Sequence, residues 1–211
     1  PFRLPGGERA GREPWRSAAA LHWECDKSWG EHLDADGLLR AAWQQQLNAP
    51  KTSAVGRLFD AAAALVCGTN KVSFEAQGPM HLESLCADVG EVIRLAQSVG
   101  SDGVLRTDWE PMLAMLSDQA RSERQRAEAF HTSMATALLQ QVRELAELHK
   151  IERVGLAGGV FQNRVLTGQV AQLLEADGYD VRLGIDLPCN DAAISFGQVA
   201  ECAALDNWEN V

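Results

Sequence analysis

The sequence predicts an α/β protein in which helices come first and a strand–helix–strand–helix unit comes last. Amphipathic spacing predicts helices through most of residues 14–149. After that, short apolar runs at 151–157 and 179–185 alternate with helical patterns at 161–178 and 190–205. Two strands joined by so long a crossover pair in parallel, and ligands bind outside the carboxyl ends of such strands. We therefore expect a functional site in the loops that follow these two strands.

Composition and charge narrow the classes of function. The chain has 211 residues, of which 46% are apolar, so it can bury a sizeable core. It carries 19 basic and 29 acidic residues, and the net charge of −10 argues against a nucleic-acid partner. The 5 cysteines lack the paired spacing of a metal site, and their odd number is typical of free thiols in a reducing compartment. No apolar run is long enough for a membrane span or a signal peptide. We predict a cytoplasmic protein with no membrane and no nucleic-acid partner.

The helices in the first part of the chain have recognisable ends. Pro14 opens the first helix, at a position where its missing N–H costs nothing. A second helix spans about residues 36–47. Thr52 or Ser53 is expected to cap the third helix, and Gly68 to close it.

The middle of the chain mixes an interrupted helix with a long regular one. Residues 73–89 have a helical pattern that Gly78 and Pro79 should break. Residues 102–109 are predicted to form a short strand, and a short helix follows it. The longest helix is expected over about residues 122–149. Its apolar stripe, which should be buried, consists of Ala127, Phe130, Met134, Leu138, Leu145 and Leu148.

Two adjacent glycines, Gly158 and Gly159, end the first strand of the α/β unit in "GGVFQNRVL". Glycines there permit positive φ and remove the Cβ atoms that would keep a flat ring or a phosphate from the backbone. The N-terminus of the following helix offers unpaired N–H groups and positive potential. A plain tight turn explains the pair equally well, and the chain has neither a P-loop nor a G-x-G-x-x-G motif. Both a nucleotide site and an ordinary turn stay open.

A second candidate lies on the third helix, "TSAVGRLFDAAAALV". Gly56 and Asp60 are four residues apart and share one stripe, roughly 140° from the centre of the apolar face. The glycine makes room for a flat group, and the carboxylate can accept hydrogen bonds from the two hydroxyls of a ribose. The alternative is a solvated aspartate beside a glycine that serves packing.

The loop "DLPCNDAAISFGQ" holds the third candidate, Asp191, which would either cap the last helix or give one oxygen to a divalent cation. The 5 histidines stand singly and are expected to be surface or packed residues. Among them, His131 next to Phe130 in the long helix is the one to follow. Cys189 has no adjacent base in the sequence, so a packing role is expected for it.

The order of several segments adds a more specific signal. The segments are "LPGGERAGREPWRSAAA", "TSAVGRLFDAAAALV", "SFEAQGPMHLE", "AFHTSMA", "LAGGVFQNRVL" and "LPCNDAAISFGQ". In sequence and spacing they resemble the C-terminal part of the HypF-type carbamoyltransferases of nickel–iron hydrogenase maturation. The resemblance covers essentially the whole chain. It implies an actin-like, sugar-kinase-like ATPase fold, here a ribonuclease-H-like α/β lobe with additional helices that is incomplete relative to the family.

The same resemblance implies a nucleotide site and a metal site. The residues that match the family's adenosine-contacting motifs are Gly56, Asp60, Gly158, Gly159, Val160 and Asn163. Asp191 matches an aspartate that joins two histidines in holding a metal ion. Those histidines form an H-x-x-x-H pair, which this sequence lacks. The implied cofactors are ATP or a carbamoyl-adenylate, and a divalent metal ion.

The implied activity is ATP-dependent transfer of a carbamoyl group, through carbamoyl-adenylate, to a cysteine thiol of the partner protein HypE. Residues 1–50 are expected to form an irregular and helical N-terminal segment, and residues 51–211 the nucleotide-binding lobe. The remaining domains of the carbamoyltransferase are the other expected partners. An apolar patch left by the incomplete fold would favour a homodimer.

Two hypotheses about activity stay open. The chain is either a piece of an enzyme that works with the rest of its polypeptide, or a non-catalytic module that binds a nucleotide or a protein. With one metal ligand of the family's three, it is expected to be catalytically incomplete by itself.

Overall fold

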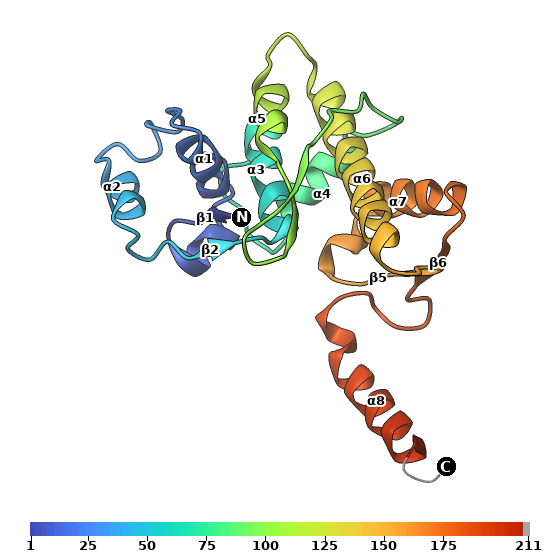
Figure 1. Cartoon of the computed structure of the whole chain (residues 1–211). Coiled ribbons are helices and arrows are strands. Elements are labelled where there is room, and N and C mark those ends of the chain that lie inside the picture. The colour runs from blue at the N-terminus through green and yellow to red at the C-terminus, as the bar shows by residue number, and fades with distance from the viewer. Residues whose placement is uncertain (209–211) are drawn as a thin grey trace.

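The computed structural model describes residues 1–208, and helices are its main elements (Figure 1). The helices are α1 (Trp15–Glu24), α2 (Leu38–Gln44), α3 (Val55–Cys67), α4 (Gln77–Ser84), α5 (Glu110–Ser117), α6 (Glu123–Leu148), α7 (Arg164–Ala176) and α8 (Ile194–Trp208), with short 3-10 helices η1 (Gly7–Gly11), η2 (Gly159–Gln162) and η3 (Asp191–Ala193). The strands within this range pair as β1 (Phe2–Arg3) with β2 (Lys51–Thr52), β3 (Gln97–Val99) with β4 (Leu105–Thr107), and β5 (Arg153–Leu156) with β6 (Asp180–Leu183). The mixed α/β class is confirmed.

The strand–helix–strand–helix unit forms as predicted. β5 and β6 run parallel, with Arg153 opposite Asp180 and Leu156 opposite Leu183. Helix α7 makes the crossover between them and packs against α6. The other two pairs are antiparallel. Of their strands only β4 was predicted, and β1, β2 and β3 were not. The loops after β5 and β6 therefore leave the same edge of the sheet, which is where a site was expected.

Helix α3 lies at the centre of the helical part and packs against α1, α4, α5 and α6. Phe59 of α3 meets Phe130 of α6 edge to face, with ring centroids 4.8 Å apart. On another side, Ala61 and Ala64 share a buried cluster with Leu21 of α1. Helix α1, from the first 50 residues, thus packs on the same helix that carries Gly56 and Asp60, while the boundary at residue 50 stays a prediction.

The ends of two helices differ from expectation. Neither predicted hydroxyl caps α3; its N-cap is Ala54, and Thr52 Oγ1 accepts the N–H of Ala54 at 3.1 Å instead. Gly68 closes α3 with φ +65°, as predicted. Gly78 and Pro79 do not break a helix. They lie in the first turn of α4, where a proline removes only an N–H that has no partner within the helix.

The buried stripe of α6 is shorter than predicted. Ala127 and Phe130 are buried, but the later members Leu145 and Leu148 are 41% and 76% exposed. Both side chains are exposed, so the prediction is wrong at that end of the helix. The start of α6 is a capping box: Ser122 Oγ accepts the N–H of Gln125, and Gln125 Oε1 accepts the N–H of Ser122.

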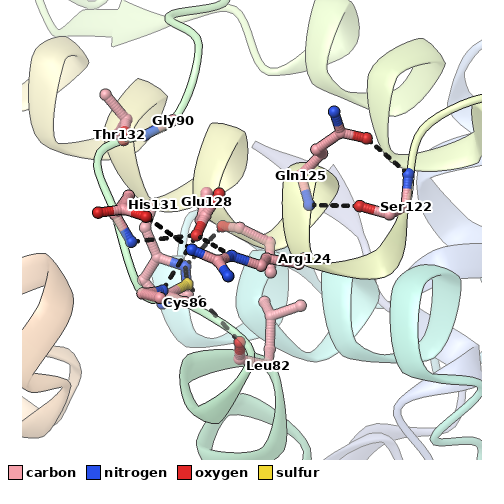
Figure 2. Close-up of polar contacts among 12 residues, drawn as sticks. Leu82, Cys86, Gly90, Ser122, Arg124, Gln125, Glu128, His131 and Thr132 are labelled. Atoms are coloured by element: carbon pink, nitrogen blue, oxygen red, sulfur yellow. Dashed lines mark hydrogen bonds and ion pairs between the residues drawn. The ribbon is translucent and has the colours of Figure 1, made fainter.

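An extended segment, residues 87–93, runs along α6 without regular secondary structure (Figure 2). Its backbone N–H groups donate to α6 side chains: Ala87 and Asp88 to Glu128 at 3.0 Å each, Gly90 to Thr132 at 2.9 Å, and Ile93 to Ser133 at 2.9 Å. At Gly90 the two backbones are so close that an added Cβ would overlap the backbone of Glu128. This segment, the α6 strap, is thus held by the helix at nearly every turn.

Helix α8 projects away from the other helices (Figure 1). Its exposed apolar side chains are Ile194, Phe196, Val199 and Leu205, and the preceding loop adds Ile185. An apolar surface of this kind normally contacts another protein or another part of the same protein. Within residues 1–208, no helix is both long and apolar enough to cross a membrane.

Candidate functional site

The turn after β5 has the backbone conformation that a glycine was predicted to allow. Gly158 has φ +115°, in the region that disfavours side chains, whereas Gly159 begins η2 without a positive φ. A Cβ added at either glycine would meet no atom within 4 Å. Gly158 is therefore required by the backbone, and Gly159 leaves open space above the turn.

Asn163 ends the turn and starts α7. Its side chain is buried, with 8% exposure, and Oδ1 accepts the N–H of Leu166 at 2.8 Å as an N-cap. The amide nitrogen Nδ2 lies 3.0 Å from Nε2 of His131 on α6. Asn163 thus fixes the turn to both its own helix and a neighbouring one.

Gly56 lies in the first turn of α3, and a Cβ there would also meet no atom within 4 Å. Gly78 is different, because its Cβ would come within 3.1 Å of the Ala63 methyl group. The packing explanation for a helical glycine therefore applies to Gly78 and not to Gly56. Gly56 weakens helix α3 without any packing gain in the described chain.

Asp60 is buried, with 3% exposure, so the solvated-aspartate alternative is wrong. Its Oδ2 has no hydrogen bond to another residue in the described chain, although Arg57 Nη1 approaches it to 2.7 Å as an ion pair. Arg57 can be this close without a hydrogen bond when its N–H bonds do not point at Oδ2. Burial raises the pKa of the carboxyl to about 6 despite Arg57. Asp60 is therefore an incompletely satisfied buried carboxylate.

The structure brings the motifs of the candidate site close together. Helix η2 packs against α3, which places the turn beside the helix of Gly56 and Asp60. The N–H of Gly158 also donates to the carbonyl of Cys189, two residues before Asp191. The loops after β5 and β6 therefore meet, as the parallel pairing predicted.

Asp191 is exposed at the start of η3. Asn190, not Asp191, caps this turn, because its Oδ1 accepts the N–H of Ala192 at 3.2 Å. No group of three His, Cys, Asp or Glu residues that could hold a metal ion occurs in residues 1–208. The described residues alone therefore do not fit a divalent cation.

A cavity of about 660 Å³ borders the candidate site. Its walls come from the start of α3, from β4, from α6 and from the turn after β5, where Ala157, Val160 and Phe161 line it. Among the predicted site residues only Val160 lines this cavity. Most of its wall is apolar, so it suits a flat apolar group next to the turn better than a phosphate.

Two residues outside the predicted set of site residues touch the candidate site. Arg57 faces Asp60 across one helical turn, and His131 faces Asn163 from 32 positions earlier in the chain. The "AFHTSMA" segment pointed to His131, but no local pattern indicates which residue its ring contacts.

Comparison with known proteins places the chain in a family. A family model described as "Carbamoyltransferase, Kae1-like Domain, second subdomain" matches residues 1–198. The carbamoyltransferase HypF homolog of Cupriavidus necator is 36% identical over 92% of this chain and 54% of its own length. Carbamoyltransferase HypF of Rhodobacter capsulatus is also 36% identical, over 97% of this chain and 27% of its own length. The chain thus spans about half of one relative and about a quarter of the other.

Solved structures give the same result. A crystal structure of full-length HypF in the phosphate- and nucleotide-bound form matches with a TM-score of 0.82 and 27% identity, over 94% of this chain and 27% of that one. HypF of T. kodakarensis has a TM-score of 0.71 at 20% identity, over 90% and 27%, which supports the fold alone. The chain belongs to the HypF carbamoyltransferase family, as the second subdomain of its Kae1-like domain.

Proposed function

We propose that this chain is the nucleotide-binding part of an ATP-dependent carbamoyltransferase, one lobe of an actin-like fold. Adenosine, as part of ATP or of carbamoyl-adenylate, lies between α3 and the turn of residues 158–163. The observation that carries the proposal is the buried carboxylate of Asp60, whose Oδ2 accepts no hydrogen bond within residues 1–208, together with the open Cβ positions of Gly56 and Gly159. A structural relative at 27% identity is described in a nucleotide-bound form, which supports it.

Each residue of the proposed site has a binding or orienting task. The carboxylate of Asp60 accepts hydrogen bonds from the ribose hydroxyls, once the partly exposed Arg57 turns aside. The absent side chains of Gly56 and Gly159 let the flat parts of the nucleotide approach the backbone. Val160 supplies an apolar wall, and Asn163 keeps the turn in shape through its cap on α7.

The reaction itself needs groups from outside this chain. In the proposed activity, carbamate reacts with ATP to give carbamoyl-adenylate and pyrophosphate, and the carbamoyl group then passes to a cysteine thiol of a HypE-type partner with release of AMP. Asp191 would give one oxygen to a divalent ion whose other ligands lie elsewhere in the protein. Because the described residues do not fit that ion alone, binding and orientation of the nucleotide are the only tasks assigned to this chain.

A non-catalytic binding module is the second candidate. Asp191 belongs to no group of three or more potential metal ligands in residues 1–208, which favours it. Adding back the remaining carbamoyltransferase domains separates the two. Restored carbamoyl transfer would identify a piece of an enzyme, and nucleotide binding without restored transfer would identify a binding module.

Isothermal titration calorimetry with ATP and with AMP tests nucleotide binding. The wild type should bind both, and Asp60→Ala and Gly159→Val should each weaken binding at least about tenfold, since each removes one element of the site. Gly168→Ala is a matched control, because that glycine lies in α7 with open space around it. No binding by the folded wild type, or equal binding by all variants, would contradict the proposal.

A further inference from the structure

His131 lies between the two halves of the proposed nucleotide site and is fully buried, with 0% exposure. On one side its ring meets Phe59, the neighbour of Asp60 on α3, at 5.3 Å between centroids and close to edge-on. On the other side Nε2 lies 3.0 Å from Asn163 Nδ2. One buried side chain thus contacts both α3 and the residue that ends the turn.

The hydrogen bonds around His131 fix where its proton is. Because Asn163 Oδ1 accepts the N–H of Leu166, the amide presents its NH₂ group to the ring. Nε2 must then be the unprotonated acceptor. The proton is on Nδ1, which lies 2.8 Å from the carbonyl oxygen of Ala127 and donates to it. Burial lowers the pKa of His131, so the neutral ring is favoured.

The thiol of Cys86 is also close, with Sγ 3.3 Å from Nδ1 (Figure 2). Cysteine, histidine and asparagine are the residue types of one kind of catalytic triad. Here Nδ1 already carries a proton and cannot take one from the thiol. Burial also raises the pKa of Cys86 to about 12. The cluster therefore orients its members and does not supply a nucleophile.

We propose that His131 is a positioning residue that holds the turn of residues 158–163 against α3 in the shape that receives a nucleotide. The effect of His131 on nucleotide binding rests on the proposed function. Without the ring nitrogen, the buried NH₂ group of Asn163 has no acceptor and the turn loses its tie to α6. Leaving such a buried donor unpaired is equivalent to about a tenfold or larger change in an equilibrium constant.

Two variants of His131 separate the acceptor from the bulk of the ring. His131→Leu keeps an apolar side chain in the core but offers no acceptor, whereas His131→Gln offers an amide oxygen to Asn163. The measurement is the rate of amide hydrogen exchange in the peptide that covers residues 158–166, with the α1 peptide as an internal control. His131→Leu should speed exchange in the turn about tenfold and weaken AMP binding by a similar factor. His131→Gln should restore most of both, and exchange in α1 should not change.

Asn163→Ser tests the same contact from the other side and leaves the His131 ring in place. Serine can still cap α7 but cannot reach His131, so exchange in the turn should rise as it does in His131→Leu. If His131→Leu does not fold, Asn163→Ser alone tests the positioning role of His131. Unchanged exchange in the turn of Asn163→Ser, or equal exchange in the Leu and Gln variants of His131, would overturn the positioning role. Faster exchange in these variants, together with a wild type that binds no AMP, would support the positioning role and refute the nucleotide site.

Discussion

Replacing Asp60 with asparagine should stabilise the protein and weaken nucleotide binding at the same time. The carboxylate is 3% exposed and one of its oxygens has no hydrogen bond within residues 1–208. Burial raises its pKa from 3.8 to about 6, although Arg57 lies 2.7 Å away. At neutral pH the folded protein therefore holds a charge that the unfolded chain carries more easily. Such a cost at a binding site is typical of a trade-off between stability and function.

The magnitude follows from the pKa. The difference between 3.8 and about 6 corresponds to about 3 kcal/mol of lost stability, at about 1.36 kcal/mol for each pKa unit. Asparagine removes the charge but leaves a buried amide imperfectly bonded, which costs about 1 to 2 kcal/mol. The net gain expected for Asp60→Asn is about 1 to 2 kcal/mol.

The pH dependence has a definite sign. Because the folded state has the higher pKa, it binds the proton more tightly than the unfolded state does. The destabilisation is complete above pH about 6 and shrinks as the pH falls to 3.8, below which both states are largely protonated. The advantage of asparagine should shrink over the same range.

Urea denaturation of both proteins at about pH 8 and about pH 4.5 measures this gain. Asp102→Asn is the control, because Asp102 is exposed and Arg106 holds the pKa of its carboxyl below the usual value, so no gain is expected. An Asp60→Asn protein that is less stable than wild type at pH 8, or a gain that does not change with pH, would refute the reasoning.

Three further predictions concern the fold. Gly90→Ala should lower the free energy of unfolding by about 2 kcal/mol or more, because the added methyl group overlaps the α6 backbone. Gly168→Ala, which adds its methyl group in open space, should raise it by up to about 1 kcal/mol. Equal stabilities of the two variants in urea denaturation would contradict this. Ser122→Ala should cost about 1 kcal/mol through loss of the capping box, and an unchanged urea midpoint would argue against that cap. Burial lowers the pKa of His22 and His131, so the stability that their neutral rings contribute is complete above pH about 6.5 and is lost as the pH falls below that value. An NMR titration in which either ring has its ordinary pKa would contradict this.

Local signals in the sequence were sufficient for the last part of the fold. The parallel pair of β5 and β6 followed from the change in periodicity and from the length of the crossover. The positive φ of Gly158 followed from a glycine pair at the end of a strand. Both features depend on residues that are close in the sequence, and for that reason they could be predicted.

Features that depend on distant packing could not be predicted. Asp60 is buried because the elements around α3 enclose a position that helical spacing alone assigns to the polar side. The α6 strap is bonded to side chains about 40 positions away, and β3 forms only because β4 faces it. Leu148 continues the apolar stripe of α6 but is exposed, because nothing in the described chain covers it.

The central claim is that α3 and the turn of residues 158–163 form one adenosine site. The most direct test is an NMR titration of the ¹⁵N-labelled chain with AMP. The account predicts that the amides of Gly56, Gly159 and Val160 shift together with one dissociation constant, while those of α2 stay in place. Shifts in only one of the two motifs, or different constants for the two, would contradict a single site.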